Sequence, residues 1–143
     1  MRIILKISAM PLLLLLAACH SSNPAKLVYS DKVIQQIEWS EAELKRDIAI
    51  RHLYRSSDAS THLIRLKGNE RPHYHDHHDL SVTVISGKSI IHFKDHEVSL
   101  APGDVLFISK ETLHWAENVT PGASVVFAVF SPAFDGKDKR KAE

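Results

Sequence analysis

The feature that most constrains the fold is a series of short apolar runs in the later two thirds of the chain. From residue 48 onward, runs rich in Val, Ile, Leu and Phe recur between turn-forming pairs such as Gly87-Lys88 and Pro102-Gly103. Spacing this short leaves no room for the crossover connections of about ten or more residues that parallel strands require. The pattern therefore predicts an all-β, antiparallel barrel or sandwich.

Turn residues separate nine predicted strands. Gly, Pro, Asn, Asp and Ser are the residues that most often break a strand, and they stand at nearly every boundary. We expect strands at 48–54, 60–66, 72–75, 80–86, 89–94, 97–100, 104–108, 113–118 and 123–130.

A helical segment is predicted before the first of these strands. Apolar residues recur at roughly helical spacing over 31–46, and Asp31 is a candidate N-cap. A second start at Ser40 is also open, because Glu43 three residues later would complete a capping box.

The N-terminus has the pattern of a secretory signal. Arg2 and Lys6 precede an apolar run that ends at Ala18, and this run is shorter than the roughly 20 residues that span a bilayer. The four residues Leu16-Ala17-Ala18-Cys19 resemble the lipobox of bacterial lipoproteins, in which the cysteine is lipidated and the preceding bond is cut. Cys19 is the only cysteine in the sequence.

The resemblance to the lipobox implies a lipid anchor at Cys19 and a location in the cell envelope. In a Gram-negative cell, His20 instead of aspartate after the cysteine favours the outer membrane, facing the periplasm. The expected organisation is a signal peptide at 1–18, a lipidated cysteine and tether at 19–30, a folded domain at 31–134 and a charged tail at 135–143.

Histidines carry the chemical signal of the folded part. The sequence has 10 histidines, and His73, His75, His77 and His78 are close together. His73 and His75 are two residues apart, so a strand places both on one face. Imidazole is a common ligand for transition metals, and His114 on a later predicted strand could complete a site.

Two motifs resemble those of the cupin superfamily. The family's first motif is G-x5-H-x-H-x(3,4)-E-x6-G, and here Gly68, His73, His75 and Gly87 match it, with the first glycine one residue closer. The second motif is G-x5-P-x-G-x2-H-x3-N, and Gly103, His114 and Asn118 match it with the family's spacing. Ser109 replaces the proline of this motif, and Glu111 replaces its glycine.

The resemblance implies a small cupin-type, jelly-roll-like β-barrel with a metal bound by His73, His75 and His114. The family's fourth ligand is a glutamate, but Leu80 stands at its position. Asp79 is the candidate acidic ligand, since a shift of one residue in the preceding loop would bring its carboxylate inward; His78 is a weaker alternative. The expected cofactor is a divalent ion of Fe, Mn, Ni or Zn.

Three functional hypotheses remain open at this stage. The first is a membrane-anchored cupin that binds a divalent metal and a small molecule, as a metal-dependent oxygenase, isomerase or lyase. The second is a ligand-binding or sensing module without catalysis, favoured by the apolar Leu80. The third is a structural envelope protein without metal, for which pairing into a homodimer is expected by analogy. The net charge of +1 gives no indication of a nucleic-acid partner.

Overall fold

The computed structural model describes residues 25–34 and 36–142, so the predicted signal segment and Cys19 lie outside the described residues. The chain divides after Ile37 into two units. In the first unit, β1 (Leu27–Val28) pairs with β2 (Val33–Ile34) as a short antiparallel hairpin.

The predicted helix over 31–46 is wrong for most of its length. The described residues contain one helix, α1 (Glu41–Leu44), and part of the predicted segment forms β2 instead. The alternative start at Ser40 is confirmed, because the Ser40 hydroxyl accepts from the Glu43 amide and the Glu43 carboxylate accepts from the Ser40 amide. Neither α1 nor any other described segment forms a helix with the length and hydropathy to cross a bilayer.

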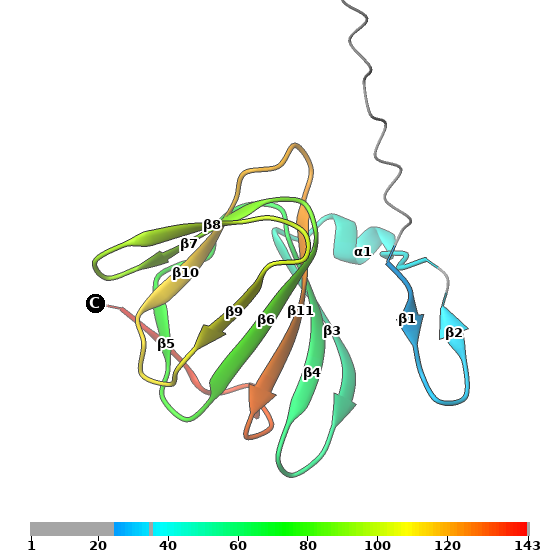
Figure 1. Cartoon of the computed structure of the whole chain (residues 1–143), viewed down its shortest axis with the longest axis horizontal. Helices are drawn as coiled ribbons and strands as arrows, with labels where there is room; N and C mark the ends of the chain where they lie inside the picture. Colours follow the sequence, from blue (N-terminus) through cyan, green and yellow to red (C-terminus); the bar gives the residue numbers. More distant parts are fainter. Residues whose placement is uncertain (1–24, 35, 143) are drawn as a thin grey trace, which may run out of the picture. The chain divides into compact units, whose positions relative to one another are not determined.

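The prediction of an all-β, antiparallel fold is confirmed in the second unit (Figure 1). Each of the nine predicted strands is present, and its ends lie within one residue of the expected positions. The strands are β3 (Ile48–Arg55), β4 (Ser60–Leu66), β5 (His73–His75), β6 (Asp79–Ser86), β7 (Ser89–Phe93), β8 (Glu97–Leu100), β9 (Val105–Ile108), β10 (His114–Asn118), β11 (Ser124–Ser131) and the unpredicted β12 (Lys139–Lys141).

The strands of this unit form two antiparallel sheets of five. One sheet has the order β12-β5-β10-β7-β8, and the other has the order β3-β4-β11-β6-β9. Strands that are distant in sequence are therefore neighbours, and β10 lies between β5 and β7 in the first sheet. This topology brings the two histidine-bearing segments of the sequence into direct pairing.

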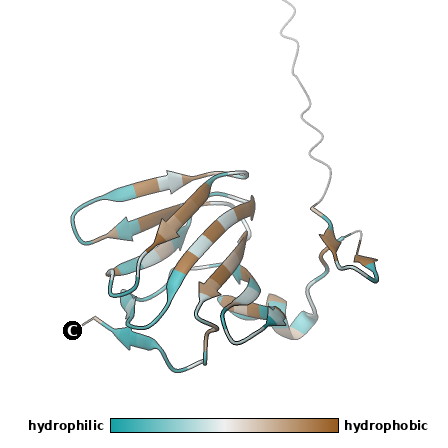
Figure 2. Ribbon diagram, turned by 60° about the horizontal axis from the view of Figure 1, so that its bottom comes forward, coloured by the Kyte–Doolittle hydropathy of each residue, from teal (hydrophilic) through white to brown (hydrophobic). Residues whose placement is uncertain are grey.

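Alternation along the strands builds the core between the sheets. On β6, Leu80, Val82 and Val84 are buried, whereas the intervening residues are more exposed. Figure 2 shows the resulting alternation of hydrophobic and hydrophilic bands along the strands. Leu80 and Val82 pack with residues of β9 and β11, while Val84 packs with Ile91 and Leu100 of the opposite sheet.

The turn after β6 depends on a glycine. Gly87 has a φ of +77°, and a Cβ there would lie 2.7 Å from the Ser124 Cα atom. Gly103 also has a positive φ, of +94°, but a Cβ there would meet no atom within 4 Å. The two positions therefore share the backbone conformation and differ in the space around it.

Replacing Gly87 with alanine should lower the free energy of unfolding by roughly 3 kcal/mol, from left-handed strain and overpacking together. Gly103→Ala is the matched control and should cost about 1 kcal/mol, because it adds strain alone. Urea denaturation followed by circular dichroism measures both. Equal losses in the two variants would contradict the role of the close approach to Ser124.

Candidate metal centre

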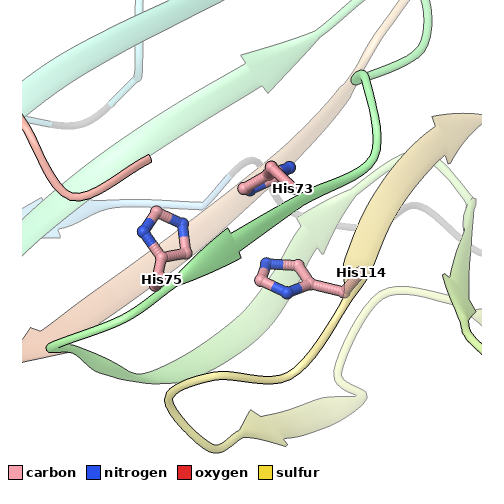
Figure 3. Close-up of side chains that lie close together, drawn as sticks. All are labelled: His73, His75 and His114. Carbon is pink, nitrogen blue, oxygen red and sulfur yellow. The ribbon is translucent and has the colours of Figure 1, made fainter. Parts of the chain in front are cut away.

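Strands β5 and β10 bring three histidines together (Figure 3). His73 and His75 lie on the same face of β5 and are buried, and His114 opens β10 directly opposite His73. One ring nitrogen from each residue lies within 4.8 Å of the other two. The structure thus places the three sequence-predicted histidines in one cluster, which we call the three-histidine centre.

Hydrogen bonds set the tautomer of all three rings. The Nδ1 atom of His73 lies 2.9 Å from the Arg71 carbonyl oxygen, and that of His114 lies 2.9 Å from the Thr112 carbonyl oxygen. The His75 Nδ1 atom lies 3.1 Å from the Asp138 carbonyl oxygen. Because a carbonyl oxygen only accepts, each Nδ1 carries the proton and donates, which leaves the lone pair on each Nε2.

Burial keeps these imidazoles neutral. It lowers the pKa of His73 to about 4 and that of His75 to about 4, and the neighbouring histidines lower the pKa of His75 further. Burial also lowers the pKa of His114. Neutral imidazole is the form that binds a metal, so all three rings are in the ligating form at neutral pH.

The predicted acidic ligand Asp79 lies outside this cluster. Among the described residues, the cluster that could hold an ion consists of the three histidines, and Asp79 Oδ1 accepts a hydrogen bond from the Lys110 amide at 2.8 Å. Leu80, at the family's glutamate position, packs in the core and lines the same cavity as the three histidines. The parity of β6 explains the difference, because successive side chains of a strand face opposite sides.

Glu70 is a carboxylate beside the centre that the sequence reasoning missed. It lines the same cavity as the three histidines, and its Oε2 and Oε1 atoms accept from the Ala116 amide at 3.1 Å and the Lys139 ammonium at 3.3 Å. Burial raises the pKa of Glu70, but the charge of Lys139 and the hydrogen bond from the Ala116 amide outweigh this effect, so the pKa is lowered. Glu70 stands at an unspecified position of the first motif, between Gly68 and His73, so no sequence signal marked it.

The C-terminal segment, predicted to be a charged tail at 135–143 after the folded domain, contains β12, which pairs with β5. Lys139 lies opposite His75, and Lys141 lies opposite His73. Arg140 stacks over the Tyr74 ring and forms two hydrogen bonds of 2.8 Å with Asp76. The strand that carries two of the histidines is thus held between β10 and the end of the chain.

Asp138 joins this segment to the loop after β5. Its buried carboxylate accepts from the Asp76 amide at 3.0 Å, the His77 amide at 2.9 Å and the His78 ring. His78, the weaker alternative to Asp79 as a ligand, is buried and bonds to Asp138, and it is not part of the cluster of three histidines. The hydrogen bonds of His78 to Asp138 and to the Ala133 carbonyl oxygen hold this loop against the C-terminal segment.

An internal cavity of about 330 Å³ adjoins the three-histidine centre. Its lining comes from both sheets and is mostly aliphatic or aromatic, with the three histidines, Glu70 and Lys139 as its ionisable groups among the described residues. A concave, largely apolar pocket with a few polar groups is the usual form of a small-molecule site.

His62 is a buried histidine away from the centre. Its Nε2 atom lies 2.8 Å from the Ser60 hydroxyl, and its buried Nδ1 atom has no hydrogen-bond partner in the part of the chain that the structure describes. Burial, followed by the charges of His52 and Arg55, lowers the pKa of His62 to about 4. The unfolded chain therefore takes up a proton on His62 between pH 6.5 and 4 that the folded chain does not.

The free energy of unfolding should consequently fall as the pH drops through this interval. The His62→Leu variant should lose about 1–2 kcal/mol less of it than the unmodified protein. Denaturation of the metal-free protein at pH 7 and pH 4.5 measures the effect, since the other histidines titrate in both proteins. The exposed His96 provides the control variant His96→Gln. An identical pH dependence in His62→Leu and the unmodified protein would contradict the buried, neutral state of His62.

The three-histidine centre fits a divalent ion. Zinc–imidazole bonds are about 2.0–2.1 Å long, so nitrogens bound to one ion lie at most about 4.2 Å apart, and the three ring nitrogens here lie within 4.8 Å of one another. Three protein ligands leave further coordination positions for water or another molecule, which is the arrangement of catalytic rather than structural sites.

Comparisons with known proteins agree with this architecture. A family model described as "Cupin domain" matches residues 62–130. An uncharacterised protein of Aquifex aeolicus is 36% identical over 120 residues, which cover 82% of this chain and 98% of the relative.

Two solved structures are similar over most of the second unit. The structure of KdgF from Halomonas sp. has a TM-score of 0.60 and 25% identity, and the match covers 69% of this chain and 91% of KdgF. A conserved protein with a double-stranded β-helix domain from Klebsiella pneumoniae has a TM-score of 0.56 and 22% identity. The match covers 66% of this chain and 84% of the Klebsiella protein. The second similarity concerns the fold alone.

Proposed function

Residues 62–130 form a cupin domain, and on this premise we propose that the protein binds one divalent metal ion at the three-histidine centre and a small molecule in the adjoining cavity. The observation that carries the proposal is that the three imidazole rings share one tautomer and converge. Each Nδ1–H donates to a backbone carbonyl, and a nitrogen of each ring converges with the other two. Rings held only by packing would not need this shared orientation.

His73, His75 and His114 would hold the ion. A set of three imidazoles suits Fe, Mn, Ni or Zn, and the donor set alone does not favour one of them. When bound, such an ion supplies Lewis-acid chemistry, by polarising a carbonyl or lowering the pKa of a water molecule.

The chain's own groups would prepare the cavity for a ligand. The three carbonyl acceptors fix the rings, and the ion pair of Lys139 with Glu70 keeps a charged carboxylate at the cavity wall. The aliphatic walls exclude water from the remaining space, which strengthens electrostatic interactions with a bound ligand.

A second candidate function is ligand binding without catalysis. Leu80 at the position of the family's glutamate favours it, because the centre then lacks a charged protein ligand and its cavity is more apolar. This candidate predicts that His73→Ala and His114→Ala leave ligand affinity unchanged. Metal-dependent turnover of a substrate would exclude it.

Metal titration tests the proposal. Protein stripped with a chelator is titrated by calorimetry with Fe(II), Mn(II), Ni(II) and Zn(II), one ion at a time. We expect one ion per chain for at least one metal, and no binding by the triple variant in which His73, His75 and His114 are alanine. Absence of stoichiometric binding for all four ions would overturn the proposal.

The proposal extends to location, where its support is the sequence of the N-terminus. Leu16-Ala17-Ala18-Cys19 resembles a lipobox, so we propose cleavage before Cys19, lipidation of its thiol and anchoring in the cell envelope, with the folded domain facing the periplasm in a Gram-negative cell. A triacylated cysteine carries enough buried methylene groups for stable anchoring.

Cys19→Ser is expected to abolish labelling by radioactive palmitate and to move the protein from the membrane fraction to the soluble fraction. Expression in a Gram-negative host followed by fractionation and mass spectrometry of the N-terminal peptide measures both. An unmodified Cys19 in the mature protein would contradict the anchor and would leave the metal centre unaffected.

A further inference from the structure

The walls of the cavity offer almost no hydrogen bonds beyond its histidine end. Side chains of both sheets line it, among them Ile64, Val82, Ile91 and Leu106. The hydroxyl side chains in the lining are Ser89 and Ser124, and the Ser89 hydroxyl donates to that of Ser124 at 2.8 Å. This pair is buried and its members already bond to each other.

These walls select against a polyhydroxylated ligand. A hydroxyl group that enters an apolar cavity gives up its hydrogen bonds to water and finds no replacement there. An aliphatic or aromatic body of the same size loses nothing on desolvation and gains contacts with the walls. The part of a ligand that lies away from the histidines is therefore expected to be apolar.

The charges at the histidine end favour an anion. Lys139 and Glu70 form an ion pair and balance each other, and each histidine donates its Nδ1–H to a carbonyl oxygen, so that it would bind an ion as a neutral imidazole. Leu80 supplies no negative charge at the position where the family's motif has glutamate. A divalent ion held here would thus lack a charged protein ligand, and an uncompensated charge in an apolar cavity is unfavourable.

We propose that the cavity takes a small organic anion with a single carboxylate at the histidine end, beside Lys139, and an apolar body between the two sheets. This inference rests on the proposed binding of a divalent ion. It assigns specificity to Lys139 and Leu80 at the head of the ligand and to the aliphatic walls along its body. It also separates this cavity from one built for sugars or sugar acids.

Three six-carbon probes test the carboxylate head and the apolar body of the ligand separately. Hexanoate has the carboxylate and the apolar body, gluconate has the carboxylate and a hydroxylated body, and hexan-1-ol has a hydroxyl head and the apolar body. Each is titrated by calorimetry into protein loaded with Co(II), whose visible absorption spectrum also reports a new ligand at the ion. We expect hexanoate to bind at least 10-fold more tightly than either other probe and to change the spectrum.

Variants assign the selectivity to named residues. Lys139→Met should weaken hexanoate at least 5-fold and leave hexan-1-ol unchanged, whereas Lys141→Met, at an exposed position of the same strand, should change neither. Leu80→Glu should weaken hexanoate at least 10-fold while retaining Co(II). If the Leu80→Glu variant does not fold, the comparison of Lys139→Met with Lys141→Met still tests whether Lys139 recognises the carboxylate.

The outcomes separate this inference from the proposed function. If Co(II) fails to bind, the proposed function fails and the inference falls with it. If Co(II) binds but gluconate or hexan-1-ol binds as tightly as hexanoate, or if hexanoate does not bind, the ligand class is wrong and the metal centre stands. An unchanged hexanoate affinity in Lys139→Met would remove the role of Lys139.

Discussion

Replacing His114 with alanine is expected to weaken the binding of a divalent ion at least about 100-fold, more than the 10- to 100-fold cost of removing a residue that only orients a ligand. His114 is the sole contribution of β10 to the three-histidine centre. Its loss leaves two ligands on one strand, which cannot surround an ion. His73→Ala and His75→Ala should have effects of the same order.

Calorimetric titration of the folded variants measures this loss, with circular dichroism as the check of folding. His92→Ala is the matched control, because His92 also lies in the first sheet but is outside the cavity lining, where it bonds to Glu117 and stacks on Trp115. Metal affinity within threefold of the unmodified protein in His114→Ala would exclude His114 as a ligand.

Asp138→Ala is expected to have the largest effect on stability, a loss of roughly 3–5 kcal/mol in the free energy of unfolding, typical of breaking a buried pair. Two backbone amides and the His78 ring lose their acceptor together. Because the carbonyl of the same residue orients His75, displacement of this segment should also weaken metal binding roughly 10- to 100-fold.

Urea denaturation and metal titration of the same preparation separate the two effects. Lys141→Ala, at an exposed position of the adjoining strand β12, is the control and should change the free energy of unfolding by less than about 0.5 kcal/mol. If Asp138→Ala were destabilised but bound metal with unchanged affinity, the segment would support the fold without orienting the centre.

The strands and the histidine cluster could be predicted because local signals determine them. Turn residues define the strand ends, and the spacing of His73 and His75 puts both on one face of β5 whatever its neighbours are. His114 required the motif, since its pairing opposite His73 depends on the sheet topology. Glu111, which stands where the motif has glycine, adopts a φ of 61° and so keeps the backbone conformation of that turn.

The surroundings of the centre could not be predicted, because they depend on contacts between distant segments. Glu70 is recognisable only once Lys139 and Ala116 are placed beside it. The sequence of β12 is Lys-Arg-Lys, which carries no strand pattern, and its pairing with β5 accompanies the buried contacts of Asp138. The helix prediction over 31–46 was wrong because its apolar spacing was incomplete, and a four-residue helix needed only the capping box.

The most direct test of the metal centre is a crystal structure of protein loaded with the best-binding ion, with anomalous scattering recorded at that metal's absorption edge. We predict one anomalous peak within bonding distance, about 2.0–2.2 Å, of the Nε2 atoms of His73, His75 and His114. A metal peak elsewhere on the chain, or none at full loading, would contradict the account.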